Sequence, residues 1–129
     1  MNSAMTTDRA RTLLFRILLV ILLGTISYLA FTPIHYPLLD SVWDKLRHAA
    51  AFVALALAVD YSFPDRGYDA AKVLPLIAYG VAIEIVQHFL PYRQFDLLDV
   101  IGDAIGLFTY GMSLPLIRRL PLLRSAGPG

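Results

Sequence analysis

Long apolar runs separated by short polar turns set the organisation of this chain. Four such runs cover residues 13–31, 43–63, 73–90 and 97–117. A helix of about 20 residues spans the roughly 30 Å hydrocarbon core of a bilayer, and each run approaches that length. Prolines stand in the turns between the runs, where they end helices. The pattern predicts an all-α membrane protein, built as a bundle of four transmembrane helices.

Composition agrees with a lipid environment. Only 16% of the 129 residues are charged and 57% are hydrophobic, whereas a soluble domain usually carries about 25% charged residues. The length allows one domain. A cleaved signal peptide is the alternative for residues 13–31, but its apolar region would be only about 7–15 residues long. We therefore expect this first run to remain as a membrane span.

Arginines near the ends of the runs predict the orientation. Three lie before or in the first turn of the first span, and three follow the last one: Arg9, Arg11, Arg16, Arg118, Arg119 and Arg124. Basic residues favour the cytoplasmic side, and an even number of spans places both groups there. The prediction is an N-in/C-in bundle, with residues 1–12 and 118–129 in the cytoplasm and the membrane domain between them.

Two further features exclude classes of function. The formal net charge of +1 leaves no basic excess to neutralise phosphates, so we expect no nucleic-acid partner. The absence of cysteine removes disulfides, thiolate metal sites and a cysteine nucleophile. Membrane lipid is the partner that the composition does predict, whereas the oligomeric state does not follow from the sequence.

Ionisable and amide side chains gather at the outer ends of the second, third and fourth predicted spans. At 1.5 Å per residue, all of them lie within about 10 Å of those helix ends. Three segments of alternating direction therefore bring polar groups to one level of the membrane. The residues are Asp44, Lys45, Arg47 and His48; Glu84, Gln87 and His88; and Asp96, Asp99 and Asp103.

Helical periodicity also places these residues on one face of each span. At about 100° per residue, Asp99 and Asp103 share a face with Gly106, and Glu84 shares one with Gln87. A carboxylate exposed to hydrocarbon costs at least a few kcal/mol, so the polar faces should meet one another or a water-filled cleft. Simpler roles remain open for some members, such as a helix cap for Asp44, and Asp60 is expected at the inner interface.

Charge counting within the cluster leaves two acids in excess. Either a carboxyl group holds a proton, or the histidines are charged, or a cation binds. No metal-ligand spacing is present, so we predict no metal site or cofactor and keep a divalent cation as a weak alternative. Lys45 and Arg93 are also suited to hold a phosphate or carboxylate from an envelope substrate.

The same residues carry a family resemblance. Asp44-Lys45, His48 and Phe52 give the string DKxxHxxxF; residues 84–93 give ExxQxxxPxR; Asp99 and Gly106 give DxxxxxxG. As a set, these strings resemble the VanZ-like family of small bacterial inner-membrane proteins. The resemblance covers residues 44–111, and the first span shares only its hydrophobicity.

The resemblance implies a multi-pass protein of the bacterial inner membrane with a shared polar site. By matching position, its ligand-binding residues would be Asp44, Lys45, His48, Glu84, Gln87, Arg93 and Asp99. Asp103 is added to this set, although the family usually has asparagine there. The named member of the family is associated with low-level resistance to the glycopeptide teicoplanin, which implies a link to the cell envelope and no particular reaction.

Three functions are compatible with the cluster. The preferred one is a pocket that binds a polar envelope ligand, such as a lipid-linked or cell-wall head group. The alternative is a membrane-embedded enzyme acting on a lipid-linked head group, with Glu84 and His48 as acid and base and Asp99 as a further catalytic candidate. A transporter ranks last, because the inner half of the bundle lacks a polar path.

Overall fold

The computed structural model describes residues 3–32, 41–91 and 97–121, with side chains from residues 8–32, 45–91 and 97–121. The described residues form helices and no strands, which confirms the prediction of an all-helical fold. The four helices are α1 (Ser3–Phe31), α2 (Ser41–Ser62), α3 (Ala70–His88) and α4 (Leu97–Ile117). Three of them match the predicted spans to within about three residues, whereas α1 begins ten residues before its apolar run.

Among the described residues, three helices are long and apolar enough to cross a membrane. They are α1 from Asp8 onward, α3 and α4. The protein is therefore a membrane protein. The helix α2 is not in this group, because charged residues flank its apolar stretch, with Lys45 and Arg47 before it and Asp60 after it. A fourth span formed by α2, and the N-in/C-in orientation, stay predictions.

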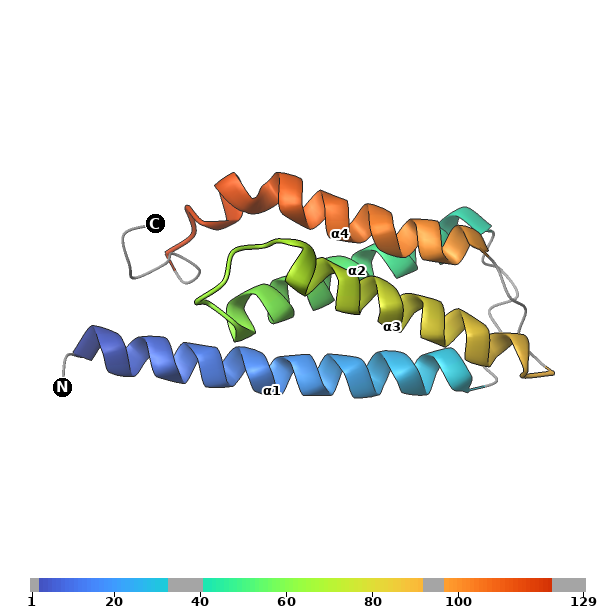
Figure 1. The fold of residues 1–129 in the computed structure, drawn as a ribbon, viewed down its shortest axis with the longest axis horizontal. Coiled ribbons are helices and arrows are strands. Elements are labelled where there is room, and N and C mark those ends of the chain that lie inside the picture. Colours follow the sequence, from blue (N-terminus) through green and yellow to red (C-terminus); the bar gives the residue numbers. More distant parts are fainter. Residues whose placement is uncertain (1–2, 33–40, 92–96, 122–129) are drawn as a thin grey trace.

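The helices lie alongside one another in alternating directions, with α1 and α4 on opposite sides and α2 and α3 between them (Figure 1). The helix α2 packs along both outer helices. One end of the bundle, here called the Arg16 end, holds the α2–α3 connection and the end of α4. The opposite end, called the His48 end, holds the end of α1, the start of α2 and the start of α4.

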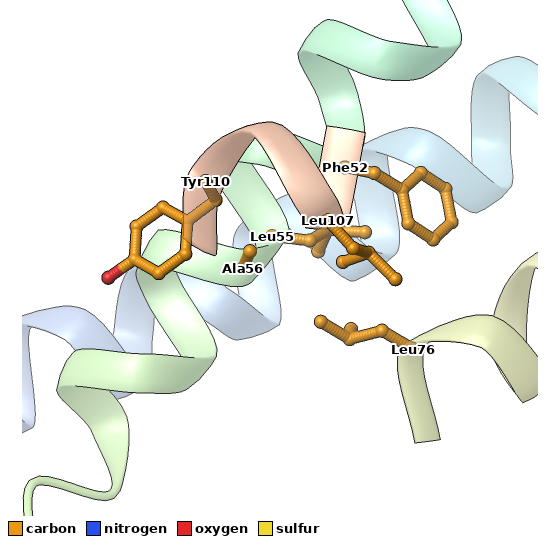
Figure 2. Packing of buried hydrophobic residues seen from close by; sticks show 6 residues of the cluster. All are labelled: Phe52, Leu55, Ala56, Leu76, Leu107 and Tyr110. Carbon is orange, nitrogen blue, oxygen red and sulfur yellow. The ribbon is translucent and has the colours of Figure 1, made fainter. Parts of the chain in front are cut away.

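A compact apolar core lies in the middle of the bundle. Its buried members are Phe52, Leu55, Ala56, Leu76, Leu107 and Tyr110, and they come from α2, α3 and α4 (Figure 2). Lipid tails are as apolar as these side chains, so burial alone gives little net attraction between helices in a membrane. Close packing and polar contacts between the helices must therefore supply specificity.

The helices α2 and α4 approach closely at Gly106. A Cβ atom at this position would collide with the backbone carbonyl of Ala49. Backbone cannot move aside as a flexible side chain can, so only glycine permits this spacing. The close contact keeps the polar residues of α2 and α4 within hydrogen-bonding distance farther toward the His48 end.

The Arg16 end holds a buried polar network that the sequence analysis did not anticipate. Asp60, expected at the membrane interface, is 6% exposed, and its carboxylate accepts hydrogen bonds from Lys72 Nζ at 2.6 Å and from the Tyr110 hydroxyl at 2.6 Å. Lys72 is 3% exposed and also donates to the Arg66 carbonyl at 2.6 Å. This network joins the ends of α2 and α4 to the start of α3.

Tyr68, in the connection between α2 and α3, packs on α4 beside this network. Its hydroxyl donates to the Leu107 carbonyl at 2.7 Å, and its ring meets Tyr110 edge-on at 4.9 Å. Burial, and secondarily the charge of Asp60, raise the pKa of Tyr68 to about 12. The hydroxyl therefore stays protonated and keeps its hydrogen bond at any physiological pH.

Candidate functional site

An ion pair and a hydrogen-bonded histidine–carboxylate pair join α2 to α4 at the His48 end. Lys45 Nζ lies 2.5 Å from Asp99 Oδ1, and His48 Nδ1 lies 2.9 Å from Asp103 Oδ1. His48 Nε2 also approaches Asp99 Oδ2, at 3.7 Å. His48 thus stands between two carboxylates of the neighbouring helix, with one ring nitrogen turned toward each.

Helical spacing explains why these four residues pair. Lys45 and His48 are three residues apart on α2, and Asp99 and Asp103 are four apart on α4, so each pair occupies one helix face. Gly102, between the aspartates, lets α4 approach the Lys45 carbonyl, which would lie 3.4 Å from a Cβ at that position. The interlocking of two polar faces follows from this periodicity and from the small residue between them.

The helix α3 adds Glu84 to the cluster. Its side chain is fully buried, at 0% exposure. One ligand atom each from His48, Glu84 and Asp99 lies within 4.8 Å of the other two, so residues of three helices converge at this point. One turn before Glu84, Gly80 faces Asp103, whose Oδ2 would lie 2.5 Å from a Cβ there. The absence of a side chain at Gly80 makes room for the Asp103 carboxylate.

A cavity of about 180 Å³ opens beside the cluster. Its polar wall comes from Arg47, His48, Gln87 and Asp103. Its apolar wall comes from Ile26, Leu29, Ala30, Ala51, Phe52 and Ile83. The volume far exceeds the roughly 30 Å³ that a water molecule occupies in the liquid. The cavity is therefore amphipathic and large enough for part of a small polar group.

Gln87 fixes the α1 side of this cavity. Its Nε2 donates to the Ala30 carbonyl of α1 at 2.9 Å, and its side chain is 6% exposed. Nearer the bundle centre, the Ser27 and Tyr79 hydroxyls lie 2.6 Å apart and link the same two helices. Polar contacts of this kind orient helices that have no hydrophobic reason to associate in lipid.

The convergence of His48, Glu84 and Asp99 offers one nitrogen and two carboxylate oxygens, a donor set that suits several divalent cations. Lys45 already places a positive charge against Asp99 at 2.5 Å, which reduces the need for a cation there. The absence of a metal site therefore stays a prediction, and no metal enters the functional proposal below.

The structure brings most of the predicted site residues together. Lys45, His48, Glu84, Asp99 and Asp103 form one cluster, and His48 and Asp103 join Gln87 in lining the cavity. Two predicted residues lie outside what is described: Arg93 entirely, and Asp44 in its side chain. Their role in ligand binding stays a prediction.

Two contributions to the cavity were missed from the sequence. Arg47, which the sequence places in the polar cluster but not among the predicted ligand-binding residues, lines the cavity; its position on the same helix face as His48 was the available signal. The wall from α1, formed by Ile26, Leu29 and Ala30, had no signal, because α1 carries no charged residue in this region.

Comparison with known proteins identifies the family. The VanZ/LLP1 family description matches residues 2–118. The chain belongs to the VanZ/LLP1 family. This match extends the predicted resemblance to include α1. A protein of the yeast Schizosaccharomyces pombe, described as uncharacterized, is 34% identical over 91 residues, which are 67% of this chain and 54% of the relative.

The chain thus spans about half the length of this curated yeast relative. Because the relative is eukaryotic, VanZ/LLP1 membership by itself does not fix a bacterial inner membrane as the location. No solved structure matches the chain.

Proposed function

We propose that the cavity at the His48 end binds the polar head group of a lipid-linked envelope compound. The observation that carries this proposal is the composition of its wall, in which Arg47, His48, Gln87 and Asp103 face an apolar side from α1, α2 and α3. An amphipathic cavity between membrane helices suits a molecule with both a polar head and a hydrocarbon tail.

The chemistry of the polar wall favours a head group with both hydroxyl and anionic groups. Arg47 donates hydrogen bonds and suits a phosphate or carboxylate, whereas Asp103 accepts hydrogen bonds, as from a sugar hydroxyl. The neighbouring pair of Lys45 and Asp99 is 2.5 Å apart and compensates its own charge. A lipid-linked sugar phosphate combines these features.

The proposed location is the bacterial cytoplasmic membrane, with α2 as a fourth span and both termini inside. The arginines near the start of α1 and the end of α4 support this orientation. In it the His48 end lies at the outer leaflet, where lipid-linked envelope intermediates are used. The association of the named VanZ member with teicoplanin motivates glycopeptide susceptibility as a cellular readout.

The test uses a variant that fills the cavity. Ala51 lines it, whereas its neighbour Ala50 is exposed on the outside of α2. We expect Ala51→Phe to weaken binding of a polyprenyl-phosphate-linked sugar by about tenfold or more, and Ala50→Phe to leave it unchanged. Native mass spectrometry of the detergent-solubilised protein measures retention of this lipid. Equal retention by Ala51→Phe and the unchanged protein would refute the proposal.

A second candidate, a membrane-embedded enzyme, rests on the contacts of His48. A hydrogen bond from one ring nitrogen to Asp103 fixes the imidazole, while the other nitrogen faces Asp99 and lies near Glu84. This is the arrangement of an oriented general base. The same lipid incubated with the protein distinguishes the candidates: turnover that is lost in Glu84→Gln supports the enzyme, and retention without turnover supports binding alone.

A further inference from the structure

A second and larger hollow lies at the other end of the bundle, among α1, α2 and α3. Its volume is about 470 Å³. Most of its lining is apolar, contributed mainly by Leu19, Leu23, Val59, Pro75, Leu76 and Tyr79. It is separate in its lining residues from the cavity at the His48 end. We call it the Arg16-end groove.

Two arginines stand at the mouth of this groove. Arg66, in the α2–α3 connection, lines it with an exposed side chain. Arg16 lies beside Phe63, another lining residue, with its guanidinium 5.6 Å from the centre of that ring. Arg16 Nε also donates to the Ser62 carbonyl at 2.9 Å, which holds the guanidinium at this position while its terminal nitrogens remain available as donors.

The acidic residues near the mouth do not line the groove. Asp60 is buried and already accepts from Lys72 and Tyr110, so this pair contributes little net charge at the surface. Asp69 accepts a hydrogen bond from the backbone of Ala71 and caps α3, and Asp65 is exposed. The lining carries Arg66 and Lys72 and no carboxylate, and Arg16 lies against its Phe63 wall, so the mouth is cationic.

The order of charged and apolar residues along the groove matches the head group and acyl chain of a lipid. Arg16 and Leu23 are seven residues apart on α1, which corresponds to about 10 Å along the helix. The groove thus runs from a cationic mouth to an apolar interior, with Pro75 and Tyr79 following the same direction on α3. This order of charge and hydrocarbon along the membrane normal is complementary to an anionic phospholipid.

We propose that the Arg16-end groove binds an anionic phospholipid, with an acyl chain against Leu19, Leu23 and Leu76 and the phosphate at Arg16 and Arg66. Arginine binds phosphate through two parallel hydrogen bonds, and basic pockets between membrane helices recognise anionic head groups in this way. The bound lipid fills the gap between α1 and α3 that their polar contacts leave open toward the Arg16 end.

The test compares charge removal at two places on the same end of the molecule. Arg16→Gln/Arg66→Gln, called the mouth variant, removes both guanidinium groups at the mouth of the groove. The control variant, Arg118→Gln/Arg119→Gln, removes two exposed arginines after α4 that do not line the groove. Native mass spectrometry with phosphatidylglycerol and phosphatidylcholine measures the lipid retained by each protein. We expect the mouth variant to lose about tenfold in retention of phosphatidylglycerol relative to phosphatidylcholine, and the control variant to keep its preference.

A second pair of variants tests where the acyl chain lies. Ala71 lines the groove, whereas Ala82 is exposed on the same helix and lines none of the three hollows described between the helices. Ala71→Trp should reduce retention of both phospholipids, and Ala82→Trp should not. If Ala71→Trp fails to fold, the comparison of Arg16→Gln/Arg66→Gln with Arg118→Gln/Arg119→Gln still decides whether the groove binds an anionic phospholipid.

Three results would overturn the proposal. If both arginine variants lose their preference for phosphatidylglycerol equally, general surface charge explains the binding. If the mouth variant keeps its preference, the phosphate does not contact Arg16 and Arg66. If a folded Ala71→Trp protein retains both phospholipids fully, the acyl chain does not lie in the groove. These outcomes are independent of the proposal for the His48 end, because Ala51→Phe alters a cavity that shares no lining residue with this groove.

Discussion

Asp99 and Lys45 show how single residues determine the behaviour of the His48 end. The Asp99 side chain is 9% exposed and that of Lys45 23%, so their ion pair lies largely outside bulk water. Taking either charge out of water is costly, and the partner charge offsets that cost. Removal of one partner should therefore lower the free energy of unfolding more than removal of both.

A double-mutant cycle measures this coupling. We expect Lys45→Met and Asp99→Leu each to lower the free energy of unfolding by roughly 2–4 kcal/mol, because each removes the ion-pair partner from a charge that is largely shielded from water. The double variant should be more stable than either single variant. Denaturant unfolding in detergent gives the three values.

The pair of Asp8 and Arg11 provides the control, because its charges lie 3.9 Å apart and the Asp8 side chain is 42% exposed. Its cycle of Asp8→Asn and Arg11→Gln should give a coupling below about 1 kcal/mol, because water screens the exposed carboxylate. Strictly additive losses for Lys45 and Asp99 would show that the two side chains do not compensate one another.

At the scale of the helices, the spacing between α2 and α4 is set by Gly106. Its backbone lies against the Ala49 carbonyl, so an added methyl group has no room and α4 must move away. The pairs of Lys45 with Asp99 and of His48 with Asp103 depend on the same spacing. A change at one glycine should therefore disturb two polar contacts between α2 and α4 that it does not touch.

We expect Gly106→Ala to lower the free energy of unfolding by roughly 1–3 kcal/mol, the usual cost of overpacking. Gly24→Ala is the matched control, because a Cβ at Gly24 meets nothing within 4 Å and alanine favours a helix over glycine. Its stability should be unchanged or slightly higher. Thermal unfolding of both variants checks this, and a stable Gly106→Ala protein would contradict the spacing described for α2 and α4.

Much of the helical arrangement could be predicted from the sequence, and some of it could not. Apolar runs and prolines gave helix boundaries close to those observed, and the faces of Asp99, Asp103 and Glu84 followed from periodicity. Periodicity does not specify which neighbour a uniformly apolar helix packs against, so the α1 wall of the cavity was missed. The pairing of Asp60 with Lys72 was also missed, because Asp60 lies near the end of its helix and was expected to be solvated at the membrane interface.

At the scale of the whole molecule, polar groups are concentrated at two levels with an apolar core between them. The cluster of Lys45, His48, Asp99 and Asp103 occupies one level, and the network around Asp60 occupies the other. At each level, side-chain contacts join α4 to helices that precede it in the chain. The account of function depends on the first level being enclosed by helices rather than facing lipid.

Cross-linking between α2 and α4 tests this claim most directly, because the chain has no cysteine of its own. A Cβ at Gly102 would lie 3.5 Å from the His48 Cβ, within the range of a disulfide. In membranes, His48→Cys/Gly102→Cys should form an intramolecular disulfide on oxidation, seen as protection from a maleimide mass tag. His48→Cys/Ile101→Cys should not, because Ile101 is exposed on the outside of α4. Efficient cross-linking to position 101 and none to position 102 would mean that α4 turns its aspartates away from α2.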